Sequence, residues 1–259
     1  MILNKDLRIK IVKMITKAGE GHIPSSFSIL DIVHFLYNNI IKYKSNNPKW
    51  EKRDYFVLSK GHGAPALYVV LNKFKILKNK HIMEYGSKIG ILGGHPDATK
   101  IPGVEASTGS LGHGFPTAIG LALGLKIQKK TNKIFVLIGD GECHEGTIWE
   151  SANIGTNLNL GNLCVIVDWN GSAAQLMPKD DLLNKWKAFG WKTFVVNGHS
   201  EDEFKKVFKK IKFSLDGTPS LILAKTIKGK GVSFLEGHGK WHHKLPNKDE
   251  QKKIFKELK

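Results

Sequence analysis

The sequence predicts a doubly wound α/β domain, in which helices cover both faces of a mostly parallel sheet. Two runs of strand length, 134–138 and 163–167, are fully apolar, and the segment between them, 146–157, has helical spacing. Further strands are expected at 193–196 and 220–224. Fully apolar strands that alternate with helices are typical of parallel sheets buried on both sides.

The N-terminal part of the chain is predicted to form helices. Residues 5–17 carry apolar side chains at helical spacing, and this pattern stops at the glycines and proline of 18–24. Ser28 and Asp31 have the spacing of a capping box, so a second helix is expected to begin at Ser28.

The elements that follow are less regular. An element over 54–72 is entered through a Ser-Lys-Gly-His-Gly run, and a glycine-rich stretch covers 86–114. Small residues over about 117–129 predict a helix, and an amphipathic helix is expected over 201–213, between the last two strands.

Length and composition predict a globular protein with one large domain or two small ones. The chain is 41% hydrophobic and 24% charged, which argues against disorder. The only cysteines, Cys143 and Cys164, are too few for a disulfide framework, so a reducing, cytoplasmic location is expected. Since no apolar run approaches the roughly 18 residues of a membrane span, no membrane association is expected.

The charge is strongly basic. Lys and Arg number 40 against 23 Asp and Glu, giving a formal net charge of +17. These cations are scattered, and the sequence has neither zinc-finger spacing nor an arginine-rich block. A solvated lysine surface is therefore favoured over a nucleic-acid-binding protein, although small phosphorylated molecules would be attracted to it.

Two polar segments follow neighbouring strands. Gly139-Asp140-Gly141-Glu142 ends one strand, and Asp168-Trp169-Asn170-Gly171 ends the next. Asp140 and Asn170 are 170 − 140 = 30 residues apart, which is one strand–helix–strand repeat. Since ligands of such sheets bind at the carboxyl ends of the strands, both side chains are expected in one crevice.

The chemistry of this pair indicates a metal–diphosphate site. Carboxylate and amide oxygens suit Mg²⁺ or Ca²⁺ rather than Zn²⁺. Gly139 and Gly141 allow close approach of a ligand, and a helix expected to begin near His144 offers free N–H groups to an anion. Each segment alone is a common turn, and their spacing is what makes the combination informative.

At these residues the sequence resembles the thiamin-diphosphate enzymes, whose signature is Gly-Asp-Gly followed after about 30 residues by Asn. The extended run from Gly139 to Glu150 is similar to transketolase in particular. Other matching motifs, in chain order, are Ala18-Gly19-x-Gly21-His22, Leu58-Ser59-Lys60-Gly61-His62-Gly63-Ala64, Gly94-His95-Pro96-Asp97, Ser107-Thr108-Gly109-Ser110-Leu111-Gly112-His113-Gly114, Ala188-Phe189-Gly190-Trp191, Lys228-Gly229-Lys230-Gly231-Val232 and Trp241-His242.

The resemblance implies a set of cofactor and metal contacts. Asp140 and Asn170 would bind Mg²⁺, or Ca²⁺ or Mn²⁺ in its place, with the backbone carbonyl near Ser172 as the third ligand. Other residues would bind thiamin diphosphate. Those near the diphosphate would be Gly139, Gly141 and His62, and those near the aminopyrimidine would be Gly109 and Leu111.

The resemblance also implies catalytic roles. Four histidines would surround the substrate, namely His22, His62, His95 and His242, with His22 and His242 favoured as proton carriers. Glu145 would join a carboxylate network that runs to the opposite cofactor site. One departure from the family pattern is Ile23-Pro24-Ser25, which follows His22 in place of Pro-Gly-Gly.

The chain resembles only the first domain of a full-length transketolase, which implies a single domain over residues 1–259. The resemblance therefore implies the N-terminal subunit of a split enzyme, inactive without a second chain that carries the pyrimidine-binding and C-terminal domains. The pair, expected with two copies of each chain, would transfer a two-carbon ketol unit between sugar phosphates, as in the pentose phosphate pathway.

Other interpretations stay open. The chain could belong to a deoxyxylulose-phosphate synthase or a 2-oxo acid dehydrogenase, which share Gly-Asp-Gly but not the set of histidine motifs. A non-catalytic subunit is a further alternative, against which the intact Asp140, Asn170 and histidines argue.

Overall fold

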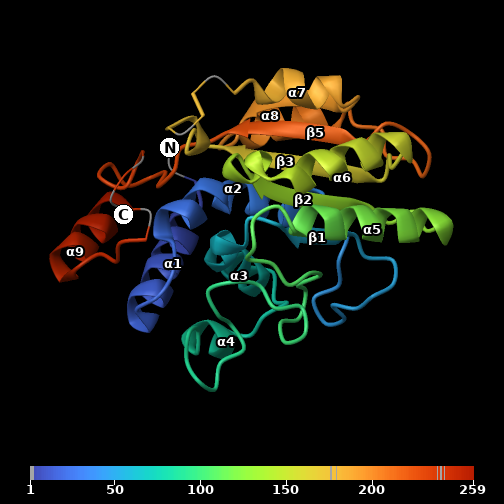
Figure 1. Ribbon diagram of the computed structural model, residues 1–259. Coiled ribbons are helices and arrows are strands. Elements are labelled where there is room, and N and C mark those ends of the chain that lie inside the picture. The colour runs from blue at the N-terminus through green and yellow to red at the C-terminus, as the bar shows by residue number, and fades with distance from the viewer. Residues whose placement is uncertain (1–2, 176, 179, 238, 240, 242) are drawn as a thin grey trace.

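The computed structural model describes residues 3–175, 177, 178, 180–237, 239, 241 and 243–259. A five-stranded sheet runs through its centre (Figure 1), in the order β1-β2-β3-β5-β4, and every neighbouring pair is parallel. The predicted parallel α/β fold is confirmed. The strands are β1 (Tyr55–Leu58), β2 (Ile134–Gly139), β3 (Leu163–Trp169), β4 (Lys192–Asn197) and β5 (Ser220–Lys225).

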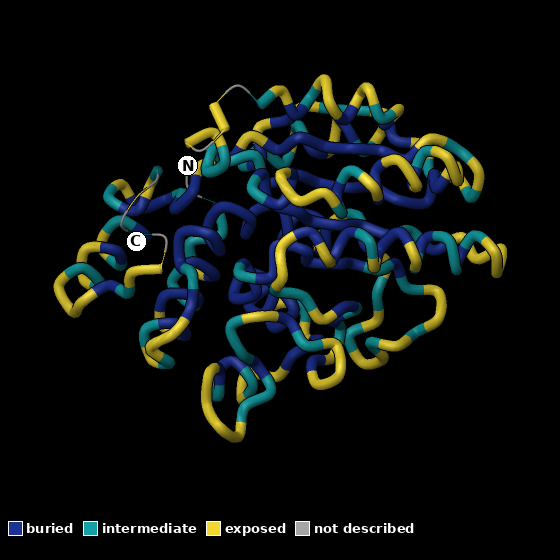
Figure 2. Tube along the Cα trace, viewed as in Figure 1, coloured by how far each residue is buried: buried dark blue, intermediate teal, exposed yellow. Residues whose placement is uncertain are grey.

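Helices cover both faces of the sheet. Side chains that alternate along each strand therefore enter two separate cores. Phe135 and Leu137 belong to one core, whereas Val136 and Ile138 belong to the other. Figure 2 shows the strands buried beneath exposed helical surfaces. The first core includes α1 (Lys5–Ala18), α2 (Ile23–Asn39), α3 (Ala64–Lys73) and α8 (Glu201–Phe208); the second includes α5 (Gly114–Ile127), α6 (Gly146–Asn157) and α7 (Leu182–Ala188).

The predicted start of the second helix at Ser28 is wrong. α2 begins at Ile23, with Pro24 in its first turn. Proline is tolerated there because the first N–H groups of a helix have no intrahelical partner. Ser28 and Asp31 are therefore interior helix positions, both buried, and they bond to other segments instead of capping the helix.

Other boundaries differ by a few residues. The small-residue helix is α5, which begins at Gly114, and the helix expected over 201–213 ends at Phe208. A 3₁₀ turn occupies Gly141–His144, so α6 begins at Gly146 rather than near His144. Elements that the sequence did not predict are α4 (Asn79–Met83), α7, α9 (Lys248–Glu257) and the 3₁₀ turn at Ala173–Gln175.

A buried ion pair ties the N-terminal helices to the carboxyl ends of the strands. The guanidinium of Arg8, which is 0% exposed, donates to both Asp31 carboxylate oxygens at 3.0 and 2.8 Å. The His199 ring bridges onward, with Nδ1 2.8 Å from the Asp31 carboxylate and Nε2 accepting from the Ile227 backbone N–H at 3.0 Å. Burial opposes ionisation of Asp31, but the hydrogen bonds from His199 and Arg8 lower its pKa to about 2.

His34 on α2 gives the fold a pH dependence. Its ring is buried, and neither nitrogen has a hydrogen bond within the described residues. Burial together with the charge of Lys73 lowers its pKa, partly offset by the Glu201 carboxylate 4.0 Å from Nδ1. The unfolded chain therefore takes up a proton here as pH falls below about 6.5, so stability decreases on acidification. We expect His34→Leu to reduce the drop in melting temperature between pH 7 and pH 5. The exposed control His113→Gln should keep the wild-type drop, and equal drops in both variants would contradict this role.

Within the described ranges, no helix is both long and apolar enough to cross a membrane.

Candidate active site

A cavity of about 350 Å³ lies at the carboxyl ends of the central strands. It is formed by the segments that follow β1, β2, β3 and β5, together with the start of α2. Most of the residues predicted from the sequence meet there. The lining residues are His22, Ser25, Lys60, His62, His95, Leu111, Gly139, Asp140, Gly141, Glu142, Asn170, Ser172 and Lys228.

The predicted metal ligands come from two adjacent strand ends. Asp140 directly follows β2, where its carboxylate accepts from the Gly141 backbone N–H at 2.9 Å. Asn170 directly follows β3, and its amide oxygen accepts from the Ser172 N–H at 2.9 Å. Burial and the negative charge of Asp168 raise the pKa of Asp140, partly offset by Lys60. A divalent cation beside Asp140 would remove this penalty, so the donor set fits Mg²⁺.

The backbone around the cavity approaches closely at two glycines. A Cβ on Gly61 would lie 2.8 Å from the Gly109 backbone nitrogen, and a Cβ on Gly109 would lie 3.2 Å from the His95 ring. Gly109 also has φ +157°, which disfavours other residues. Gly109 itself is not a lining residue, while Leu111, 40% exposed, is one.

Three histidines line the cavity, and two of them pack against each other. His22 precedes α2 and His62 lies in the 3₁₀ turn Gly61–Gly63, with 5.4 Å between their ring centroids. His243 packs edge-on against His22 at 4.7 Å, so the C-terminal segment also reaches this site. His95 lines the cavity as well. The predicted proton carrier His242 lies outside the described residues.

The two glutamates of this region have different positions. Glu145, for which the sequence predicted a role between cofactor sites, is exposed at the start of α6 and outside the cavity lining. Glu142, which the sequence did not single out, is buried in the cavity wall. Its carboxylate accepts from Ser59 Oγ at 2.6 Å and from the Gly112 and Gly139 N–H groups at 3.0 and 2.9 Å. Glu142 therefore holds three loops of the site together.

Three further lining residues were missed from the sequence. Lys60 and Lys228 are 3% and 6% exposed, so the cavity has two buried cations beside Asp140. Burial and the neighbouring Lys60 lower the pKa of Lys228, and a bound anion would oppose this shift. Ser25 is 1% exposed, and its hydroxyl has no hydrogen bond within the described residues. Lys60 and Lys228 lie within motifs that resemble the family, and Ser25 lies in the departure Ile23-Pro24-Ser25, but no role was predicted for any of the three.

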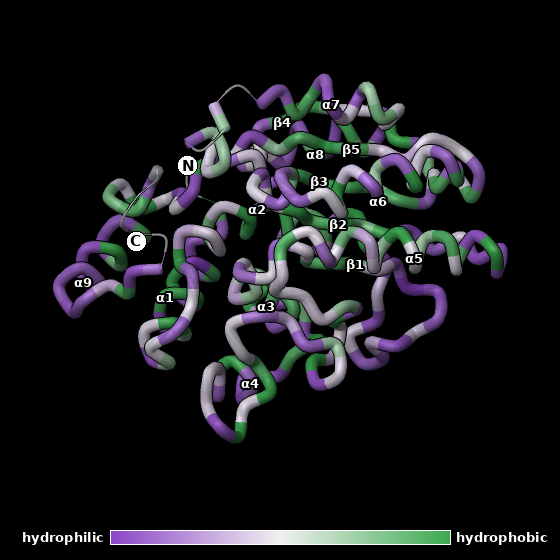
Figure 3. Tube along the Cα trace, in the orientation of Figure 1, coloured by the Kyte–Doolittle hydropathy of each residue, from purple (hydrophilic) through white to green (hydrophobic). Residues whose placement is uncertain are grey.

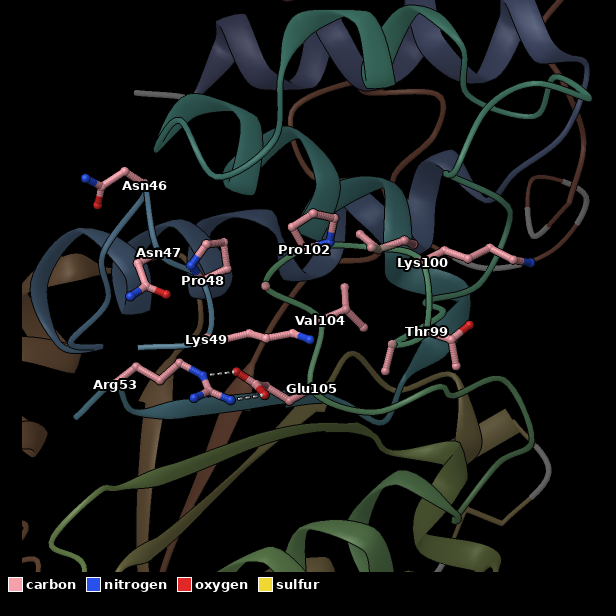
Figure 4. A pocket seen from close by; sticks show the side chains of 13 residues that line it. Asn46, Asn47, Pro48, Lys49, Arg53, Thr99, Lys100, Pro102, Val104 and Glu105 are labelled. Carbon is pink, nitrogen blue, oxygen red and sulfur yellow. Dashed lines mark hydrogen bonds and ion pairs between the residues drawn. The ribbon is translucent and has the colours of Figure 1, made fainter. Parts of the chain in front are cut away.

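A second cavity, of about 780 Å³, lies between the segments 46–53 and 98–105 (Figure 4). Its single carboxylate, Glu105, is held by Arg53 in a bidentate ion pair at 2.7 and 2.8 Å. None of the predicted site residues lines this cavity, so it is not the candidate active site.

The fold and the site together define a class of protein. A parallel sheet presents an acid, an amide, two buried lysines and several histidines at its carboxyl edge, which suits a metal-bound phosphorylated cofactor. Residues 2–258 match the family model described as "Transketolase, thiamine diphosphate binding domain". The chain belongs to this family.

The similar proteins differ in length: some are about as long as this chain, and others are more than twice as long. The chain is 37% identical over 256 residues to an apulose-4-phosphate transketolase subunit from Phocaeicola vulgatus, covering 97% of this chain and 90% of that protein. It is 39% identical over 240 residues to the 6-deoxy-6-sulfo-D-fructose transketolase subunit SqwG of a Clostridium species, covering 89% and 86%. Among solved structures, the transketolase of Leishmania mexicana matches with a TM-score of 0.89 and 26% identity, covering 98% of this chain but 40% of that one.

Proposed function

We propose that this chain is the cofactor-diphosphate-binding subunit of a two-chain transketolase, which moves a ketol unit from a ketose to an aldose. The observation that carries this proposal is the meeting of Asp140, Asn170 and the histidines in one cavity. The similarity to two proteins named as transketolase subunits, across most of their lengths, supports the two-chain arrangement.

The residues of the cavity fit thiamin diphosphate and Mg²⁺. Asp140, the Asn170 amide oxygen and the Ser172 carbonyl would hold the metal, while Lys60, Lys228 and Gly141 would face the diphosphate. When bound, the cofactor supplies a nucleophilic carbon and an electron sink. His22, His62 and His95 would donate and accept the protons of the sugar hydroxyls, since histidine changes charge near neutral pH. Both cysteines are buried and free, which suits a reducing compartment such as the cytoplasm.

The substrate is an anionic sugar. The names of the two subunit relatives indicate that one acts on a sugar phosphate and the other on a sulfo-sugar. The basic cavity and the net charge of +17 suit either anion. We favour a ketose phosphate as donor, with the sulfo-sugar as the second candidate.

The experiment pairs this chain with a candidate second subunit. The co-purified proteins should transfer a ketol unit from xylulose 5-phosphate, apulose 4-phosphate or 6-deoxy-6-sulfofructose to an aldose phosphate, only when thiamin diphosphate and Mg²⁺ are present. Either chain alone should be inactive. A pair that binds neither cofactor nor metal would contradict the proposal.

A helix surface suited to the partner chain is present on α5. Thr117, Gly120, Leu121, Gly124 and Ile127 follow one side of this helix at helical spacing, and we name them the α5 stripe. Thr117 and Gly120 are exposed, and Ile127 is 72% exposed. Figure 3 shows few hydrophilic residues along α5. A partly exposed, mostly apolar stripe that contains two glycines allows another helix to pack closely, which supports assembly through this face.

A charge on the α5 stripe should separate assembly from folding. A Cβ on Gly120 meets nothing within 4 Å, so Gly120→Glu is expected to keep or slightly raise the melting temperature of the isolated chain. The same variant should lose co-purification with the partner, because a carboxylate would be buried in the interface. Lys206→Glu, exposed on α8 at the opposite face of the sheet, is the control and should assemble normally. Normal assembly of Gly120→Glu would exclude this face.

A further inference from the structure

Asp168 is a buried carboxylate that four different segments surround. It lies at the carboxyl end of β3 and is 0% exposed. Ser28 of α2 donates its hydroxyl to both carboxylate oxygens, at 2.7 and 3.0 Å. The hydroxyl of Thr226 and the ammonium of Lys60 also bond to it, and the Asn170 amide nitrogen donates at 3.0 Å.

Asp168 itself stands behind the cavity wall. It is absent from the lining, whereas two of its partners, Lys60 and Asn170, are lining residues. A third partner, Thr226, is two residues before Lys228, which also lines the cavity. Asp168 is therefore in contact with residues of the site on one side and with α2 on the other.

The Asp168 carboxylate determines the orientation of the Asn170 side-chain amide. An ionised carboxylate only accepts hydrogen bonds, so it selects the amide nitrogen and excludes the amide oxygen from its side. The oxygen is held at the other end, where it accepts from the Ser172 N–H at 2.9 Å. This is the oxygen that a metal ion would need, beside the Ser172 backbone.

We infer that Asp168 is a positioning residue for the metal–diphosphate site: it orients the Asn170 amide oxygen toward the metal and anchors the Lys60 ammonium at the cavity wall. This inference rests on the proposed function. Residues that orient metal ligands typically change metal affinity about 10–100-fold when they are replaced.

The test is calorimetric titration of Mg²⁺ into the co-purified pair at saturating thiamin diphosphate. Asp168→Asn keeps the shape of the side chain but gives it a donor, so the Asn170 amide is free to turn over. We expect the Kd for Mg²⁺ to rise about 10–100-fold, with activity largely recovered at saturating Mg²⁺. The matched control is Asp54→Asn, a carboxylate 5% exposed at the start of β1 that accepts from the Lys42 and Lys133 N–H groups at 3.0 and 2.8 Å. That control should keep the wild-type Kd.

The outcomes separate this inference from the proposed function. If the wild-type pair binds no Mg²⁺ and cofactor, the proposed function fails. If wild-type binds and Asp168→Asn has the same Kd within twofold, the inference is overturned, even where the variant melts earlier. Should Asp168→Asn fail to fold, Thr226→Val decides: it removes one of the hydrogen bonds to Asp168, and a Kd unchanged from wild type overturns the inference, whereas a weaker Kd supports it.

Discussion

Replacing Asp140 with asparagine is expected to remove ketol transfer by the assembled pair while leaving the chain at least as stable as before. The carboxylate would supply the negative ligand of the metal, and losing several kcal/mol of charge stabilisation corresponds to a fall in kcat/KM on the order of 10³-fold. The free energy of unfolding, by contrast, should stay the same or rise. Burial and Asp168 disfavour the charged form of Asp140 in the fold, so a neutral side chain of the same shape relieves that penalty.

Thermal unfolding with and without ligand measures both effects. Wild-type protein should melt at a higher temperature when Mg²⁺ and thiamin diphosphate are added to the pair, because ligands that bind the folded state stabilise it. Asp140→Asn should lose this increase, yet its ligand-free melting temperature should equal or exceed that of wild type. A variant that melts much earlier without ligand would mean that Asp140 is structural, and retained activity would remove Asp140 from the site.

The largest effect on stability is expected from Arg8→Met. The methionine would leave the Asp31 carboxylate, 4% exposed, without the only arginine that contacts it among the described residues. Breaking a buried ion pair from one side costs about 3–5 kcal/mol, since the remaining charge stays buried. The loss should appear as a lower urea midpoint with an unchanged slope.

The double variant Arg8→Met/Asp31→Leu is the control for this assignment. Removing both charges avoids the uncompensated carboxylate, so part of the lost stability should return. Two results would show that the pair does not act as a unit. One is a cost below about 1 kcal/mol for Arg8→Met, and the other is a loss of unfolding free energy in the double variant that equals the sum of the two single losses.

The parts of the fold that follow from local patterns could be predicted from the sequence. The strands at 134–138 and 163–167 and the helix over 146–157 were placed within two residues. A fully apolar run of strand length that ends at polar residues or glycine has few other structures available. α2 was misplaced because Ser28 and Asp31 form a local capping pattern, while their actual partners are 140 residues away and 23 residues back along the chain. No local pattern carries such information. α9 was missed although Asn247 and Glu250 form a capping box, since Ile254 is its one buried residue.

The candidate site, too, could be predicted from the sequence only in part. Asp140 and Asn170 were predicted because one strand–helix–strand repeat brings two strand ends together, and both do line one cavity. Glu142 and Glu145 show what spacing cannot decide. Glu142 lies within the 3₁₀ turn Gly141–His144 and Glu145 directly follows it, and the turn buries the first while exposing the second. Lys60 and Lys228 lie in two of the motifs that resemble the family, but only their burial and their place in the lining show that they are residues of the cavity.

The α5 stripe also has a consequence for the abundance of this chain in the cell. In the proposed assembly the partner covers this mostly apolar helix face. The face is then open on every copy made in excess, where it resembles the surface of an incompletely folded protein. Such orphan copies are what chaperones retain and proteases remove. We therefore expect the abundance of this chain to follow the supply of its partner, so that raising its expression alone would increase turnover rather than the amount of enzyme.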